Sequence, residues 1–183
     1  MNKKAVTISL LIIAVGICCG TFLEIELNST DKSIILETID KTFKNSDTSD
    51  LLFLPTFFSY ASKNSLILLI MAASSFSIFT LPLCIFLLFF KTMSIGFASS
   101  IIFERLGIKG IKIILYTIFP QSLIQIPVFA LLSAMSLSFG VRTYRNKEQK
   151  KKQGPIFMKG YLIGWMLILI SNFIEAFLLV AGS

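Results

Sequence analysis

Residues 113–141 read IILYTIFPQSLIQIPVFALLSAMSLSFGV, and these 29 residues contain no charged side chain. A helix needs about 20 apolar residues to cross the hydrocarbon core of a bilayer. The stretch is therefore long enough to span a membrane, and its prolines, Pro120 and Pro127, predict breaks in the helix. A segment of this kind decides the class of fold, because a soluble domain offers it no suitable environment.

The composition of the whole chain agrees with this interpretation. Of the 183 residues, 55% are hydrophobic and only 15% are charged, whereas a soluble domain carries about 25% charged residues. The mean hydropathy is +0.81. This composition excludes a single soluble domain and predicts an all-α, polytopic integral membrane bundle.

Four other apolar stretches accompany the first, and together they predict five transmembrane segments. The third segment has 12 residues and is either a short span or a re-entrant segment. Pro82 predicts a kink in the second segment, and the last is interrupted only by Glu175. The four stretches are Ala5–Leu23, Ser65–Phe90, Thr92–Phe103 and Gly160–Ser183.

The distribution of basic residues predicts the orientation, since Lys and Arg accumulate on the cytoplasmic side. Five spans with the N-terminus inside place ten of the 17 basic residues inside, Lys91 among them. The predicted domains are an anchor helix at 1–23, an extracytoplasmic segment at 24–64 and a membrane bundle at 65–183, with a basic cytoplasmic loop at 142–159. Within the extracytoplasmic segment an amphipathic helix is predicted, with Asp31 at its N-cap and an apolar face of Ile35, Leu36, Ile39 and Phe43.

The basic loop determines topology and contacts anionic lipid headgroups, so membrane lipid is an expected partner and nucleic acid is not. Six of its residues are assigned this role: Arg142, Arg145, Lys147, Lys150, Lys151 and Lys152.

Polar side chains within the last two segments predict a cluster between them. Gln121 and Gln125 are four residues apart, and Asn172 and Glu175 are three apart, so each pair shares one face of a helix. The two segments flank one short loop, which places the pairs at comparable depth. We expect a hydrogen-bonded cluster that holds this hairpin together. Glu175 is either a structural carboxyl group or part of a proton or substrate pathway, and the structural role is favoured.

Two glycine pairs, Gly16 with Gly20 and Gly160 with Gly164, have the spacing that lets membrane helices approach closely. Catalytic signals are missing: the chain has no histidine, and no GxSxG motif, phosphate-binding loop or metal-ligand spacing. The three cysteines lie in apolar runs and predict no disulfide. We therefore expect neither an enzyme nor a cofactor.

The stretch from about Leu66 to Ala176 resembles the stage II sporulation protein M family. Its most specific part is the block FPQSLIQIPVF at 119–129. Wider relatives of the family often carry His-Gly and Glu where Gln121-Ser122 and Gln125 stand, so this chain departs toward the sporulation branch. The other matching residues are Gly96-Phe97, Leu106 to Gly110, Ser138-Phe139, Arg142 and Ile174 to Phe177.

The resemblance implies a non-enzymatic membrane component of endospore formation, located in the cell membrane at the sporulation septum and in the engulfing membrane. It implies two partners that degrade peptidoglycan, a lytic transglycosylase and an amidase, which thin the septal wall for engulfment of the forespore. The alternative is a permease or channel subunit that uses the polar residues of the last two segments. The sequence does not indicate whether the chain forms homo-oligomers.

Overall fold

The structure, a computed structural model, describes residues 3–28, 31–35, 37, 53–77, 79–145 and 147–181, and the regular structure within these ranges is helical. A short helical stretch covers residues 31–35. The labelled elements are α1 (Lys3–Glu26), α3 (Phe53–Ser74), α4 (Leu81–Leu106), α5 (Ile108–Ile113), a π-helical turn η1 (Ile114–Ile118), α6 (Phe119–Arg145) and α7 (Lys147–Ala181).

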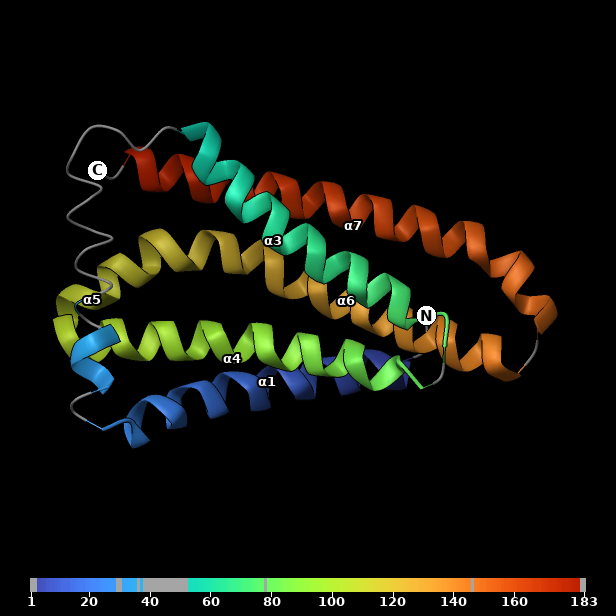
Figure 1. Cartoon of the computed structure of the whole chain (residues 1–183), viewed down its shortest axis with the longest axis horizontal. Helices are drawn as coiled ribbons and strands as arrows, with labels where there is room; N and C mark the ends of the chain where they lie inside the picture. The colour runs from blue at the N-terminus through green and yellow to red at the C-terminus, as the bar shows by residue number, and fades with distance from the viewer. Residues whose placement is uncertain are drawn as a thin grey trace.

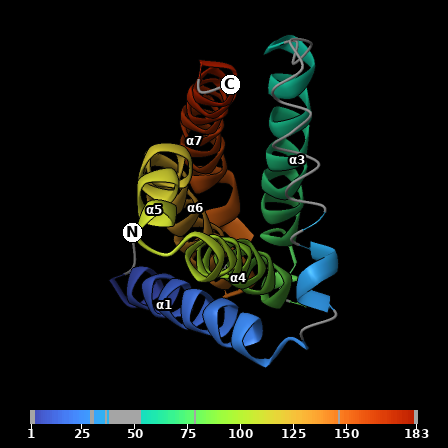
Figure 2. The ribbon, with the colours of Figure 1, turned by 90° about the vertical axis from the view of Figure 1, so that its left-hand side faces the viewer.

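The five long helices run in alternating directions along one axis (Figure 1). We call the end that holds residues 3–4, the turn between α3 and α4, and the α6–α7 junction the basic end. The end where α1 and α7 finish and where α4 meets α5 is called the opposite end. Seen along the axis, α1 and α4 form one pair, α6 lies against α7, and α3 packs beside α7 (Figure 2).

Four of the described helices are long and apolar enough to cross a membrane, namely α1, α4, α6 and α7. Many of their large apolar side chains point outward, including Phe22 and Met166, as expected for helices that face lipid on one side and protein on the other. The all-helical membrane fold is confirmed. The count of five spans is not supported, since α3 is not among the helices that are long and apolar enough to cross. The predicted orientation of the N-terminus is not supported either.

The second predicted segment, Ser65–Phe90, is not one helix. α3 ends at Ser74, and α4 begins only at Leu81, after a turn. The hydroxyl groups of Ser74 and Ser75 donate back to the carbonyls of Met71 and Ala72, which satisfies backbone oxygens at the end of α3. The helix break predicted at Pro82 does occur in this segment, but it lies between Ser74 and Leu81 and is a complete interruption, not a kink. Pro82 occupies the first turn of α4, where its missing N–H costs nothing.

The third predicted segment, Thr92–Phe103, is neither a separate short span nor a re-entrant segment. It forms the second half of α4, which continues through Lys91 without interruption. Lys91 was expected near the inner surface, but it lies midway along a helix of 26 residues. In the sequence, Lys91 separates two uncharged runs, and this separation predicts two segments where the structure has one helix.

The prolines of the fourth segment differ in effect. Pro120 lies in the first turn of α6, directly after the π-helical turn Ile114–Ile118, so a change of helix type does occur there. Pro127 lies inside α6, and the helix continues through it. The predicted break at Pro127 is therefore wrong, because membrane helices tolerate an internal proline when neighbouring groups compensate for the lost backbone hydrogen bond.

Helices α1 and α4 pack closely because glycines replace side chains at their contact. A Cβ atom added at Gly20 would overlap the Met93 carbonyl, and one at Gly96 would overlap the Ile17 carbonyl. Gly16 faces the side chain of Thr92 in the same way. The predicted role of the Gly16 and Gly20 pair is thus seen in a contact between helix backbones. Gly160 and Gly164 instead pack against the side chains of Met135 and Leu132.

The segment assigned to the extracytoplasmic side differs at both boundaries. α1 extends to Glu26, and α3 already begins at Phe53, so residues 53–64 belong to the bundle. Asp31 lies within the helical stretch 31–35 rather than before it, whereas Leu36, Ile39 and Phe43 lie outside the described residues.

Candidate functional site: a buried polar cluster

Six polar side chains from four helices meet in the interior of the bundle, and we call them the polar cluster. α3 and α4 contribute one residue each, and α6 and α7 contribute two each. The members are Asn64, Lys91, Gln121, Gln125, Asn172 and Glu175.

A chain of hydrogen bonds joins four helices through two asparagines. Lys91 Nζ donates to Asn64 Oδ1 at 2.9 Å, and Asn64 Nδ2 donates to Asn172 Oδ1 at 2.6 Å. Gln125 Nε2 donates to the same Asn172 oxygen at 3.3 Å. Asn172 is completely buried. The bonds therefore connect α3, α4, α6 and α7 where no water is available to replace them.

The carboxyl group of Glu175 lies on the other side of the cluster. With the nitrogen of its amide oriented toward α7, Gln121 donates to Glu175 Oε1 at 2.7 Å and also to Oε2. Glu175 is buried, with 8% of its surface exposed. Lys91 carries the opposite charge and attracts the carboxyl group of Glu175. The same carboxyl group also acts electrostatically on the hydroxyl group of Tyr60. The cluster thus contains one basic and one acidic side chain, Lys91 and Glu175.

The structure brings together all four residues that the sequence assigned to a polar cluster. It also adds Asn64 and Lys91, which sequence reasoning missed. Asn64 was placed in the extracytoplasmic segment, and Lys91 was placed at the membrane surface. A lysine flanked by long apolar runs on both sides was the available signal, because such a residue is expensive in a membrane unless it has a partner.

Apolar and small polar contacts surround the cluster. Phe53 packs edge-on against Phe173, with ring centroids 5.1 Å apart, and Trp165 Nε1 donates to Ser65 Oγ at 2.8 Å. Both contacts attach α3 to α7, one on each side of Asn64. Nearer the basic end, the hydroxyl groups of Ser136 and Tyr161 are hydrogen-bonded to each other across α6 and α7.

A second cluster of charged side chains lies at the opposite end of the bundle, and we call it the Lys32 bridge. Lys32 Nζ lies 2.8 Å from Glu24 Oε1 and 2.9 Å from Glu104 Oε2, while Ser100 Oγ donates to Glu24 Oε2 at 2.8 Å. Hydrogen bonds to Glu24 and then to Glu104 raise the pKa of Lys32 above its ordinary value, so Lys32 stays charged at neutral pH. The bridge ties residues 31–35 to the ends of α1 and α4.

The remaining predicted residues lie at the basic end. Arg142 is exposed and its Nη1 donates to Gln153 Oε1 at 3.4 Å. Arg145, Lys147, Lys150, Lys151 and Lys152 belong to the end of α6 and the first turns of α7, so the predicted loop at 142–159 is helical on both sides of residue 146. Among the residues described, no group of three or more metal-binding side chains comes together.

Comparison with known proteins adds a family. The family model described as Stage II sporulation protein M matches residues 9–178, which is most of the chain. No curated protein and no solved structure matches. The matched residues run from the first turns of α1 almost to the end of α7 and include the entire polar cluster and the Lys32 bridge.

Proposed function

Because the chain belongs to the Stage II sporulation protein M family, we propose that it is a non-enzymatic membrane scaffold of endospore formation that positions peptidoglycan hydrolases at the septum. The observation that carries this proposal is the polar cluster, in which the polar side chains bind one another across four helices. A cluster used in this way stabilises one arrangement of the helices. Its role is to hold the bundle together.

The orientation of the scaffold follows from charge. Nine basic residues belong to the N-terminus and the α6–α7 junction: Lys3, Lys4, Arg142, Arg145, Lys147, Lys150, Lys151, Lys152 and Lys159. Such a concentration favours the cytoplasmic side. With 22 residues, α3 is about 33 Å long and can cross beside α7, shielding Asn64 and Lys91 from lipid. The opposite end then faces the cell wall.

The Lys32 bridge gives this opposite end a fixed starting point for partner binding. It holds residues 31–35 against α1 and α4, and the connection to α3 leaves from there. A partner bound to the connection is confined to the plane of the membrane, which raises its effective concentration at the wall. A lytic transglycosylase and an amidase, the partners that the family resemblance implies, are the proposed occupants of this position.

Replacing residues 38–50 by a glycine–serine linker of equal length should abolish co-purification of the hydrolases from sporulating cells. The replacement leaves the described Lys32 bridge and all helices in place. Affinity purification with mass spectrometry measures the result, and membrane abundance of the variant controls for folding. Lys112→Met serves as the matched control and should leave hydrolase recovery unchanged, since Lys112 is exposed on α5 at the same end but belongs to neither the bridge nor the connection. Undiminished hydrolase recovery with the linker would place the interface elsewhere.

A permease or channel subunit is the competing function, and the observation in its favour is the presence of two ionisable side chains, Lys91 and Glu175, inside the polar cluster. Single cysteines along 119–129, in a chain lacking Cys18, Cys19 and Cys84, distinguish the two functions. For a scaffold we expect residues such as Ser122 and Gln125, which are buried, to resist a water-soluble thiol reagent. A continuous reactive stripe on one face of α6 would instead indicate a transport path.

A further inference from the structure

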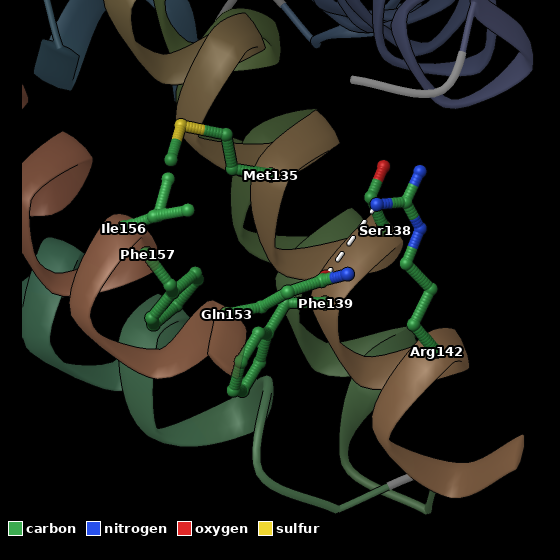
Figure 3. Close-up of a pocket in the computed structure, with 7 residues that line it drawn as sticks. All are labelled: Met135, Ser138, Phe139, Arg142, Gln153, Ile156 and Phe157. Atoms are coloured by element: carbon green, nitrogen blue, oxygen red, sulfur yellow. Dashed lines mark hydrogen bonds between the residues drawn. The ribbon is translucent and has the colours of Figure 1, made fainter. Parts of the chain in front are cut away.

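A cavity of about 330 Å³ lies between α6 and α7 at the basic end. Its apolar walls are formed by Met135 and Phe139 from α6 and by Ile156 and Phe157 from α7, as Figure 3 shows. The volume is in the range of cavities that hold small ligands. Phe139 and Phe157 stack with ring centroids 4.5 Å apart, which gives the cavity a firm wall.

The polar groups of this cavity gather on one side. Arg142 reaches back along α6, and the dashed line in Figure 3 marks its bond to Gln153. A guanidinium group has five N–H donors, and the contacts within the described ranges occupy one of them, at 3.4 Å. Ser138 also lines the cavity, and its Oγ atom is buried without a hydrogen-bond partner among the described residues. The group that the cavity offers an anion is therefore the exposed guanidinium group of Arg142.

The position of the cavity selects the class of ligand. It opens where two membrane-spanning helices end, beside the basic run at 142–152. Basic pockets between membrane helices bind the phosphate groups of anionic lipids. A free phosphate would use Arg142 but would leave the apolar walls without a partner. An acyl chain attached to the phosphate would cover them.

We propose that this cavity binds one anionic phospholipid, with its phosphate at Arg142 and an acyl chain against Phe139 and Ile156. The site goes beyond the general contact of a basic loop with headgroups, because it names one cavity with a polar side and an apolar side. It does not depend on hydrolase binding.

Native mass spectrometry of the detergent-purified protein tests the site, with phosphatidylglycerol and phosphatidylcholine titrated separately. Wild type should bind phosphatidylglycerol about tenfold more tightly than phosphatidylcholine. Both lipids carry a phosphate, but the choline group of phosphatidylcholine brings a second cation next to Arg142 and the basic run. Arg142→Gln should remove this preference. Lys112→Gln also removes one exposed positive charge, but at the opposite end of the bundle, and this variant should retain the preference for phosphatidylglycerol.

A second variant tests the apolar walls. Ile156 is 68% exposed, so Ile156→Trp can fill the cavity without disturbing the core and should abolish binding of both lipids, whereas Ile156→Ala should retain it. The proposal is overturned if Arg142→Gln binds phosphatidylglycerol as wild type does, if Ile156→Trp leaves binding intact, or if millimolar inorganic phosphate displaces the lipid.

Discussion

Replacing Lys91 by methionine is expected to destabilise the bundle by about 1 to 3 kcal/mol, the usual cost of leaving a buried hydrogen-bonding group without its charged partner. The variant leaves Asn64 Oδ1 without its donor and removes the basic group that attracts Glu175. Thermal unfolding of the detergent-purified protein measures the effect, which corresponds to a midpoint lower by about 5 °C.

Two further variants show whether the loss comes from the pair. Lys63→Met is the matched control, because Lys63 is exposed on α3 next to Asn64, and we expect little change. The double variant with Lys91→Met and Glu175→Gln should recover part of the lost stability, since neither charge then remains unpaired. If the loss of stability in the double variant equals or exceeds the sum of the two single losses, the two groups do not stabilise one another.

Introducing valine at Gly20 should separate α1 from α4 and cost about 3 kcal/mol, at the upper end of what overpacking usually costs. Its Cβ would meet the backbone of Met93 and Phe97, and backbone atoms cannot move aside as a side chain does. The same thermal measurement reports the effect.

Gly154→Val provides the comparison for this glycine. Gly154 also lies in a helix, but an added Cβ atom would have no other atom within 4 Å. The valine variant at this position should therefore unfold at the same temperature as wild type. Equal midpoints for the two valine variants would contradict the close contact between α1 and α4.

The sequence predicted the membrane bundle correctly, because long uncharged stretches report directly on lipid exposure. It predicted the boundary between α3 and α4 wrongly, since residues 65–90 carry no charge and no glycine. A weak signal was present: Thr80 stands two residues before Pro82, and proline near a helix start often follows a threonine. The turn depends on serine and threonine hydroxyl groups that donate to nearby carbonyls, and such bonds leave little trace in hydropathy.

This boundary also decided how much of the polar cluster could be foreseen. The spacing of Gln121, Gln125, Asn172 and Glu175 on two adjacent helices was visible in the sequence, and their contacts follow from it. Asn64 and Lys91 are brought in by the packing of α3 and α4, so no local spacing points to them. The Lys32 bridge joins residues 24, 32 and 104, and contacts between charges so far apart in the sequence require the fold.

Burial of Lys91 in the middle of α4 has a consequence for biosynthesis. A lysine at the centre of a helix costs about 2.5 to 3.5 kcal/mol on membrane insertion, and α4 leaves the ribosome well before the carboxyl group that balances the charge. Asn64, on the preceding helix, can bind the ammonium group as soon as α4 follows it into the bilayer. Glu175 arrives only with α7, after α4 has been synthesised. Until α7 joins the bundle, Lys91 lacks the carboxyl group that attracts it, and a chain cut short before α7 never acquires that group.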